Sequence, residues 1–372
     1  MAFEVIASCI KGLEEISQLE IKELTKQKSE VLIPSRIKFK LKEDKDLANF
    51  IYNTRSSIKI YKLISNLKFT DLNDILKKLE SIKFPKIKSP FVVRCDRTGE
   101  HSFNSIDIEK ELGNIINKDN KLKVDLKNPT TIVLVDIINN DCLVGIDYTG
   151  IKLTRRHYRI KLLPNPLNSC LAYCMLRIAN VKEKDAILDP ICRSGEIPIE
   201  AALYLQNIPN GLRLIEQLSF TKLIKFKPKD KIKVRKLKIY AIDSSQNSLR
   251  AAEINSKIAN INKNLIFSRY EIEWLDTKFK KGVIDKVVTF PQYPTNTLPK
   301  QEVESIYKEL FYQVEFILST KGNITVLTPC PELIEKYAND YKFIKEKEYK
   351  IEYMHQNFSI LKFKKIKEIA KK

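Results

Sequence analysis

The second half of the chain contains the segment Ala186-Ile-Leu-Asp-Pro-Ile-Cys-Arg-Ser-Gly-Glu-Ile-Pro-Ile-Glu-Ala-Ala202, from which its architecture can be predicted. Its pattern predicts an apolar strand ending at Asp189, then a polar turn, then a helix. In a doubly wound α/β sheet, ligands bind outside the carboxyl ends of the strands. The turn, with Gly195 where a backbone could approach a ligand, therefore predicts one wall of a ligand cleft. Taken alone, an ordinary strand–turn–helix connection explains the stretch equally well.

Helices and strands alternate on both sides of this stretch, from residue 167 onward. Helices are predicted over 167–179, 197–205, 248–259 and 301–318, and strands over 186–189, 238–242, 265–268, 286–289 and 323–327. This alternation is typical of an α/β domain with a mostly parallel sheet.

Asp243 follows the second strand of this half. Its carboxylate is acceptor-only and could take two ribose hydroxyls, or it could cap the helix that follows. The separation of Asp189 from Asp243 includes a basic insert, Lys222–Lys238, with nine Lys or Arg residues. The insert fits a solvated loop and an RNA contact equally well. The basic C-terminal tail, Lys362–Lys372, likewise fits a helix end or an RNA contact.

The first half has the pattern of a smaller α+β structure. Strands are predicted over 3–9, 37–41, 91–95, 131–137 and 141–147, and helices over 12–24, 47–51, 72–82 and 106–116. The strands at 131–137 and 141–147 should pair. Residues 149–166 form a junction crowded with basic side chains, after which the pattern changes. With 372 residues, two or three domains are expected.

The net charge of the chain indicates which classes of molecule it binds. Lys and Arg total 66 against 46 Asp and Glu, a net charge of +20. A chain this basic attracts polyanions, and nucleic acid is the leading candidate, followed by an anionic membrane. A third explanation is that the chain is simply rich in Lys and that the charge marks no particular partner. No apolar run approaches the roughly 18–20 residues that span a bilayer, so no membrane segment is expected.

The cysteine pattern argues against a metal-binding protein and against a secreted, disulfide-bonded protein. The seven Cys are scattered without a Cys-x-x-Cys pair, and there are three His, so no metal site is predicted. An odd, irregular cysteine set fits a reducing cytosol and predicts a cytoplasmic protein. The N-terminus lacks the charged and apolar regions of a signal peptide, so no secretory leader is expected.

Several segments resemble one family. The segment 189–202 resembles the Asp-Pro-x-Cys-Gly-Ser-Gly-Thr…Ile-Glu-Ala-Ala sequence of archaeal-type THUMP-containing guanine-N2 methyltransferases. Segments 9–15, 91–105, 124–129 and 207–211 are also similar to that family. Residues 145–159 resemble its Gly-x-x-Leu-x-x-Arg-x-Tyr-Arg junction. The matches follow one another in order from about residue 3 to about residue 330 and are specific as a set.

The resemblance implies an α/β fold. It consists of a Rossmann-like methyltransferase domain with a mostly parallel sheet over 156–372, preceded by an α+β ferredoxin-like subdomain over 1–65 and a THUMP domain over 66–155. It implies tRNA or another structured RNA as partner and S-adenosylmethionine as cofactor. RNA helices are bound through phosphates and 2′-hydroxyls, which suits Lys and Arg. The RNA-binding candidates are Arg94, Arg97, Lys127, Arg155, Arg156 and Arg159. For each one, an ordinary fold-stabilising or solvated role is as good an explanation.

The family pattern also assigns the cofactor residues. The cofactor-binding candidates are Asp189, Cys192, Ser194, Gly195, Asp243 and Glu271. Glu271 stands where the family usually places an Asp near the adenine, and it keeps the carboxylate. Two positions of the turn depart from the family pattern: Arg193 replaces its first glycine and Glu196 its threonine. Arg193 either fills the methionine site or points outward to RNA, and we expect impaired cofactor binding.

The catalytic loop departs from the pattern as well. The family's Asn/Asp-Pro-Pro-Tyr-Gly is Phe290-Pro-Gln-Tyr-Pro294 here. The catalytic candidates of this loop are Pro291, Gln292 and Tyr293. In the family, an Asn or Asp oxygen accepts the N–H of the guanine amine and orients the nitrogen. Phe290 has no acceptor, Gln292 could substitute only if the loop shifts, and Tyr293 could stack on a flipped base.

Three functions follow from these patterns. The leading hypothesis is a THUMP methyltransferase family protein that binds structured RNA, with methyl transfer impaired, acting as an RNA-binding subunit or as the partner of an active paralogue. The first alternative is an active S-adenosylmethionine-dependent tRNA guanine-N2 methyltransferase. The second is a purely RNA-binding protein whose former cofactor pocket is only structural.

Overall fold

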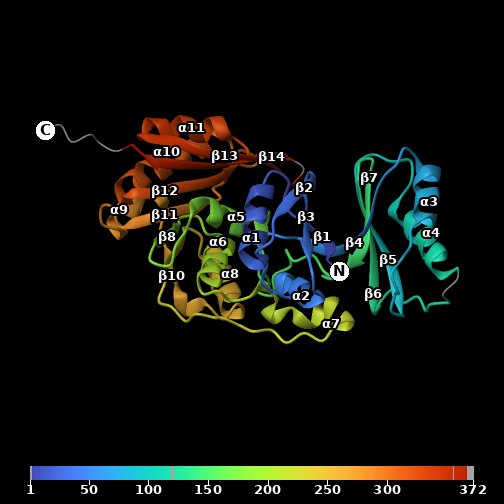
Figure 1. The fold of residues 1–372 in the computed structure, drawn as a ribbon. Coiled ribbons are helices and arrows are strands. Elements are labelled where there is room, and N and C mark those ends of the chain that lie inside the picture. Colours follow the sequence, from blue (N-terminus) through green and yellow to red (C-terminus); the bar gives the residue numbers. More distant parts are fainter. Residues whose placement is uncertain (1, 119–120, 355, 367–372) are drawn as a thin grey trace. The chain divides into compact units, whose positions relative to one another are not determined.

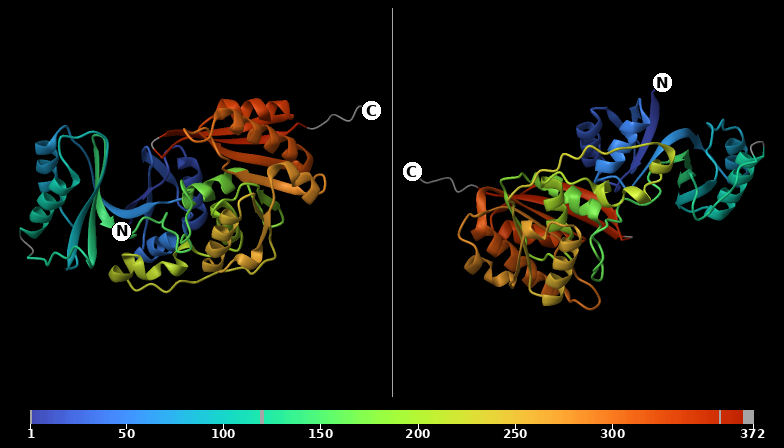
Figure 2. Two further views of the ribbon diagram at one scale, coloured as in Figure 1. Left: turned by 180° about the vertical axis from the view of Figure 1, so that it is seen from behind. Right: turned by 90° about the horizontal axis from the view of Figure 1, so that it is seen from below.

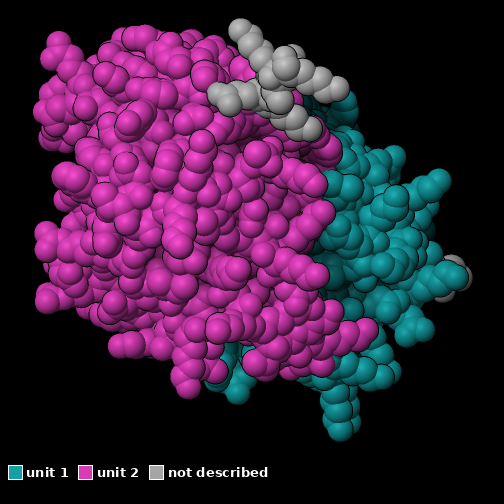
Figure 3. Space-filling model, turned by 90° about the vertical axis from the view of Figure 1, so that its left-hand side faces the viewer, with its two compact units in different colours: residues 1–9, 17–153, 210–229 teal, residues 10–16, 154–209, 230–372 magenta. Residues whose placement is uncertain are grey.

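The computed structural model describes residues 2–118, 121–354 and 356–366. It divides into two compact units (Figure 3). Unit 1 comprises residues 1–9, 17–153 and 210–229, and unit 2 comprises residues 10–16, 154–209 and 230–372. Among the helices in the described part of the chain, none is long and apolar enough to cross a membrane.

Unit 1 is built on one seven-stranded sheet with the strand order β2-β3-β1-β4-β7-β6-β5 (Figure 1). Its strands are β1 (Phe3–Ser8), β2 (Ser29–Ile33), β3 (Arg36–Leu41), β4 (Lys59–Lys68), β5 (Phe91–Thr98), β6 (Thr131–Ile138) and β7 (Asp141–Asp147). The long strand β4 joins the two parts of the sheet, because its first residues pair with β1 and its length pairs with β7. Only β5 and β6 run parallel; the other neighbouring pairs are antiparallel.

The longer helices of unit 1 bury apolar side chains, and short helices accompany them. They are α1 (Glu14–Thr25), whose residues 17–25 belong to this unit, α2 (Asp44–Asn53), α3 (Leu72–Glu80), α4 (Ser105–Asn117), α7 (Phe220–Leu223) and the short 3-10 helices η1 (Asn210–Arg213) and η2 (Ile215–Gln217). A capping box starts α4: Asn104 accepts from the N–H of Asp107, and Asp107 accepts from the N–H of Asn104. Leu47 and Phe50 of α2 and Ile75 of α3 are buried in the core.

Unit 2 contains a second seven-stranded sheet, with the order β10-β9-β8-β11-β12-β14-β13. Its strands are β8 (Ala186–Asp189), β9 (Lys238–Asp243), β10 (Leu265–Arg269), β11 (Ile284–Thr289), β12 (Leu318–Thr328), β13 (Phe343–Tyr353) and β14 (Gln356–Lys365). The strands from β10 to β12 are parallel, and β14 runs antiparallel to β12 and β13. The chain order reverses between β8 and β11, so the loops after these two strands meet at one edge of the sheet, where ligands bind in such folds.

The helices of unit 2 form two groups (Figure 2). The first group is α5 (Ser169–Ala179), α6 (Glu196–Leu205) and α8 (Gln246–Ile258), and the second is α9 (Leu275–Lys278), α10 (Lys300–Ile317) and α11 (Pro331–Asp340). Two 3-10 turns, η3 (Asn262–Asn264) and η4 (Ile272–Trp274), complete the unit. The helix α5 is buried on nearly every side, which fits its apolar sequence.

The predicted fold class is confirmed: an α+β part precedes an α/β part with a mostly parallel sheet. Strands β2, β4, β13 and β14 and helix α11 had no counterpart in the sequence-based prediction. The start of the basic tail belongs to β14, where Lys362 forms an ion pair with Glu346 and Lys365 with Glu315. Residues 367–372 of the tail lie outside the described residues.

Candidate active site

The cofactor turn lies between β8 and α6. Gly195 caps α6 with a φ of 85°, and a Cβ there would lie 2.9 Å from the Cβ of Ala252, so both conformation and space demand glycine. Arg193 also has a left-handed φ, of 49°. A non-glycine residue in this region stores roughly 1–3 kcal/mol of strain. The turn therefore keeps the backbone shape that suits a glycine, although it carries an arginine.

The side chain of Arg193 crosses to the neighbouring loop. Its guanidinium donates a hydrogen bond to the carbonyl oxygen of Pro164, and its Cζ lies 6.0 Å from the ring centroid of Phe290. A guanidinium within about 6 Å of an aromatic face is attracted by the ring. The two substitutions in the family pattern, one in each loop, therefore contact each other at the carboxyl edge of the sheet.

Phe290 belongs to an aromatic cluster with Tyr293, Phe358 and Tyr353. Its ring stacks on Tyr293 at 5.8 Å and meets Phe358 edge-on at 6.1 Å. Tyr293 and Tyr353 each lie 5.6 Å from Phe358. Phe290 itself is only 2% exposed. The position that holds the amide or carboxylate acceptor in the family is therefore packed among aromatic rings, and the Phe290 side chain itself offers no hydrogen-bond acceptor.

A small cleft lies beside the two loops. It is lined by Pro190, Ile191, Asp243, Ser244, Tyr270, Glu271, Ile272, Glu273, Gln292 and Ile306. The structure thus brings together Asp243 at the end of β9, Glu271 before η4 and Gln292 after β11. The cleft has a volume of about 120 Å³. That is below the roughly 300–1,000 Å³ of pockets that enclose small molecules.

The remaining cofactor candidates belong to the end of β8 and the turn that follows it. Asp189, Cys192 and Ser194 are buried. Ser194 donates to both carboxylate oxygens of Glu196, at 2.9 and 3.0 Å, and Arg159 approaches the same carboxylate at 3.9 Å. Burial raises the pKa of Glu196. The residue that replaces the family's threonine is therefore held by protein groups inside the turn.

Asp243 is 6% exposed and already engaged by the backbone. One of its oxygens accepts from the N–H of Arg193 at 2.9 Å and the other from the N–H of Ser245 at 2.9 Å. A carboxylate has further lone pairs, so a ribose contact stays open. The alternative role as a helix cap belongs to Ser245, whose hydroxyl accepts from the N–H of Ser248.

Burial, together with the negative charges of Asp243 and Glu196, raises the pKa of Asp189 from 3.8 to about 8. A carboxyl whose pKa is raised in the folded state contributes stability below its unfolded pKa and loses that contribution as pH rises through the folded value.

We therefore expect Asp189→Asn to flatten the pH dependence of stability between about pH 4 and 8. In the unaltered protein, this carboxyl should lower the free energy of unfolding by about 1.4 kcal/mol per pH unit across that window. Urea unfolding followed by circular dichroism at several pH values measures both slopes. Parallel profiles for the two proteins would show that Asp189 titrates near its ordinary value.

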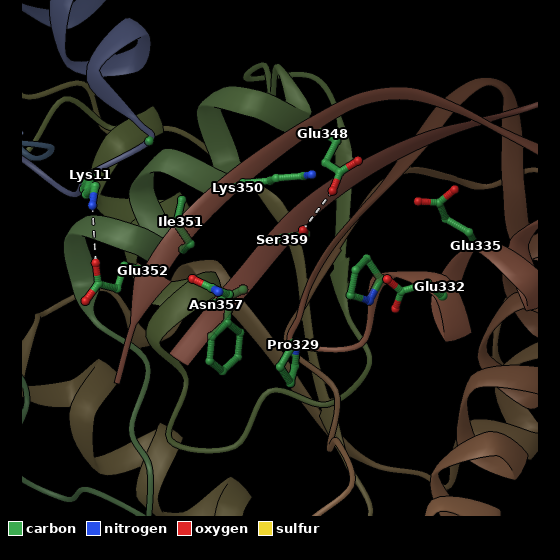
Figure 4. A pocket seen from close by; sticks show the side chains of 13 residues that line it. Lys11, Pro329, Glu332, Glu335, Glu348, Lys350, Ile351, Glu352, Asn357 and Ser359 are labelled. Atoms are coloured by element: carbon green, nitrogen blue, oxygen red, sulfur yellow. Dashed lines mark hydrogen bonds and ion pairs between the residues drawn. The ribbon is translucent and has the colours of Figure 1, made fainter. Parts of the chain in front are cut away.

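A larger pocket of unit 2, of about 700 Å³, lies between the hairpin β13–β14, the start of α11 and the loop at Lys11 and Gly12 (Figure 4). Its walls are mixed in charge: Lys11 pairs with Glu352 at 3.5 Å, and Ser359 donates to Glu348 at 2.9 Å. Phe358 lines this pocket and also contacts Phe290, so the aromatic cluster reaches its wall.

The RNA-binding candidates have different surroundings. In unit 1, Arg94 donates to the carbonyl of Leu126, Arg97 contacts His101 at 2.9 Å, and Lys127 is exposed. In unit 2, Arg155 is exposed, and Arg159 donates to the carbonyl of Leu167.

The RNA-binding role predicted for Arg156 does not fit the structure, because its side chain is only 1% exposed. Its Nε donates to Glu200 at 2.9 Å, and the Tyr158 hydroxyl donates to the same carboxylate at 3.0 Å. Burial alone would lower the pKa of Arg156, but the charge of Glu200 raises it above its usual value. A side chain held in this way cannot reach a phosphate, so Arg156 serves the fold.

Sequence reasoning missed three parts of this site. It did not identify Glu200 as the partner of Arg156, the aromatic neighbours Phe358 and Tyr353, or the contact between Arg193 and Phe290. The junction motif placed Arg156 among the basic side chains, but nothing in its spacing marked it as buried. Glu200 carried a signal, since a charged residue in the apolar helix pattern 197–205 requires a buried partner.

Comparisons with known proteins agree with the fold. A THUMP domain model matches residues 68–147, and the RMKL-like methyltransferase domain model (UPF0020) matches residues 156–357. The tRNA (guanine(6)-N2)-methyltransferase of Methanocaldococcus jannaschii is 30% identical over 342 residues, which cover 85% of this chain and 88% of the relative. The protein of the same name from Archaeoglobus fulgidus is 26% identical, with 87% and 82% covered.

Solved structures give the same result for the architecture. TrmN from Thermus thermophilus matches with a TM-score of 0.73 and 21% identity, covering 98% of this chain and 100% of that one. SMU.472, solved in complex with SAH, matches with a TM-score of 0.78 and 16% identity, covering 99% of each chain. The chain therefore belongs to the family of THUMP-containing methyltransferases with an RMKL-like methyltransferase domain, as its sequence motifs predicted.

Proposed function

We propose that this chain binds tRNA or another structured RNA and that, by itself, it transfers methyl groups poorly or not at all. One observation carries the second part: the guanidinium of Arg193, in the cofactor turn, lies over the ring of Phe290, in the catalytic loop, with its Cζ 6.0 Å from the ring centroid. Their side chains occupy the edge of the sheet where the two loops meet. The protein would then act as an RNA-binding subunit or as the partner of an active enzyme.

The residues present fit only part of the cofactor that the family implies, S-adenosylmethionine. Asp243 and Glu271 line the cleft beside apolar Ile272 and would suit the ribose and adenine. The other half of the cofactor needs the space near the turn, and there Arg193 packs toward a buried Phe290. We therefore expect a poor fit at the methionine end of the cofactor.

RNA binding has separate support. The relatives are named tRNA methyltransferases, residues 68–147 match a THUMP domain, and the net charge is +20. Phosphate contacts by Lys and Arg suit a partner recognised by shape. With Arg156 buried, the proposed contacts are Arg94, Arg97, Lys127, Arg155 and Arg159. A tRNA partner also favours a cytoplasmic protein.

An active tRNA guanine-N2 methyltransferase is the second candidate. The observation in its favour is that Gln292 is exposed and lines the same cleft as Asp243 and Glu271. Its amide oxygen could accept the N–H of a guanine amine in place of the missing Asn or Asp. For this to work, the catalytic loop would have to shift so that the amide reaches the position now filled by Phe290.

We also propose three domains, at residues 1–65, 66–155 and 156–372. Strand β4 (Lys59–Lys68) spans the first boundary and pairs on both sides, so the first two domains share one sheet and should unfold together. Limited proteolysis should therefore release them as a single fragment.

Gel-shift titration should give tight tRNA binding whose logarithm falls linearly with the logarithm of salt concentration, because bound counterions are released. A protein that makes six to ten phosphate contacts loses about 10³–10⁵ in affinity between 50 and 200 mM salt. An unstructured single strand of equal length is the control and should bind more weakly. Flat salt dependence, or equal affinity for both RNAs, would contradict the proposal.

A further inference from the structure

The basic insert has a regular charge pattern that the proposed function leaves unused. From residue 225 to residue 233, every second residue is a lysine: Lys225, Lys227, Lys229, Lys231 and Lys233. Arg235, Lys236 and Lys238 follow. In an extended chain, alternate residues point to the same side and lie roughly 6.6–7.2 Å apart. The sequence therefore places a row of like charges along one side of an extended segment.

This segment has no regular secondary structure in the fold. Residues 225–237 form neither helix nor strand, and none of them has a left-handed backbone. In unit 2, three hydrogen bonds fix alternate residues of the backbone: Asn207 Nδ2 to the carbonyl of Lys231 at 3.0 Å, the N–H of Lys233 to the carbonyl of Gln206 at 2.8 Å, and Asn264 Nδ2 to the carbonyl of Arg235 at 2.7 Å. The segment is thus held along the surface of unit 2 by its backbone.

The part of the insert in unit 1 is held in a different way. Phe226 packs on Phe220 at 5.3 Å and on Tyr52 at 5.8 Å. Lys222 donates to the side chain of Asn128 and the carbonyl of Pro129, so its charge is used within the fold. Beyond Phe226, Lys227 and Lys229 are exposed.

The lysine side chains are the free part of the segment. Lys231, Lys233, Lys236 and Lys238 are all exposed, and none of the four has an ion-pair partner within the described ranges. By contrast, Arg235 forms an ion pair with Glu183. The fold therefore fixes the backbone and the arginine and leaves neighbouring lysine charges without counter-charges. The ammonium groups of neighbouring lysines repel one another unless an external polyanion neutralises them.

We propose that residues 231–238, within unit 2, form a phosphate-binding strip for the backbone of RNA. The inference rests on the proposed RNA-binding function and names a surface beyond the THUMP match. A row of lysines alone would also attract an anionic bilayer. RNA is favoured here because residues 68–147 match a THUMP domain and the relatives are named tRNA methyltransferases. Long lysine side chains on a fixed backbone can follow a line of phosphates without reading bases.

A fourfold substitution tests the strip: Lys231→Gln, Lys233→Gln, Lys236→Gln and Lys238→Gln. The matched control removes the same charge elsewhere on unit 2, through Lys280→Gln, Lys281→Gln, Lys308→Gln and Lys321→Gln, which are exposed positions. A second variant, Lys225→Gln with Lys227→Gln and Lys229→Gln, removes three lysine charges from the part of the insert in unit 1 and should lower tRNA affinity less than the fourfold variant. Thermal unfolding of each protein establishes that the fold is kept, and binding is measured with an unmodified tRNA transcript over a range of salt.

If three of the four lysines contact phosphate, the salt slope should fall by about 2 and affinity near 0.1 M salt by about 100-fold. The control variant should keep most of its affinity. Equal losses of tRNA affinity in both fourfold variants would show that only the net charge matters, and this would contradict the proposed strip. Unchanged tRNA affinity of the strip variant, when the unaltered protein binds tRNA, would also contradict it.

Two outcomes separate this inference from the proposed function. If the unaltered protein fails to bind tRNA at any salt, the function and the strip both fall. If the strip variant loses binding to vesicles containing phosphatidylserine but keeps its tRNA affinity and salt slope, the segment is a membrane contact and the RNA strip is wrong.

Discussion

Replacing Arg193 by Gly and Phe290 by Asn should raise the affinity for S-adenosylmethionine and the rate of methyl transfer to tRNA. The glycine removes the guanidinium that packs toward Phe290 and suits the φ of 49° at this position. The asparagine restores an amide oxygen where the family holds its acceptor. One preorganised polar group at a reacting centre is commonly worth about 10²–10³ in rate, and the gain should be of this order.

Single variants separate the contributions. Phe290 is buried in the aromatic cluster, and losing a buried phenylalanine costs roughly 3–5 kcal/mol, so the double variant could unfold. Arg193→Gly alone leaves the cluster intact and should already increase cofactor binding in calorimetry. Arg193→Ala is the matched control: it removes the same bulk but not the backbone strain. If neither single variant binds the cofactor better than the unaltered protein, Arg193 does not close the site.

Arg156→Ala should destabilise the protein by about 3–5 kcal/mol, because it leaves the carboxylate of Glu200 buried without its cation. The two side chains are 1% and 0% exposed, and the Tyr158 hydroxyl donates to the same oxygen of Glu200. Urea unfolding followed by circular dichroism measures the loss.

The neighbouring Arg155 provides the control. It is exposed, so Arg155→Ala should leave the unfolding midpoint nearly unchanged and weaken RNA binding instead. A second variant, Arg156→Met with Glu200→Leu, should recover much of the stability because it removes both buried charges together. Equal stability of Arg155→Ala and Arg156→Ala would contradict the structural role assigned to the buried pair.

The sequence predicted most elements of the fold because their hydrophobic patterns are local. The parallel strands of unit 2 are short apolar runs, and their positions were predicted to within a few residues. Strand β4 was missed because Lys59–Lys68 mixes apolar and basic residues, and its pairing with both β1 and β7 is not local. The hairpin of β13 and β14 was missed for a similar reason, since lysines and glutamates interrupt β13 and pair across its exposed face.

Motif positions predicted which residues meet at the site but not where their side chains point. Topology alone brings the ends of β8, β9 and β11 together, so Asp243 and Gln292 share one cleft as parallel strand order requires. The direction of a side chain cannot be predicted in this way. Both open interpretations of Arg193 were compatible with its position in the turn, and only the structure brings its guanidinium toward Phe290. The same applies to Arg155 and Arg156, adjacent in sequence but different in burial.

The most direct test of the account is the incorporation of labelled methyl groups from S-adenosylmethionine into unmodified tRNA from a matched source, with the unaltered protein. We expect incorporation at or near background, together with salt-sensitive binding of the same tRNA. Robust multiple-turnover methylation would contradict it. The protein would then be an active enzyme in which Gln292 or a backbone carbonyl orients the amine.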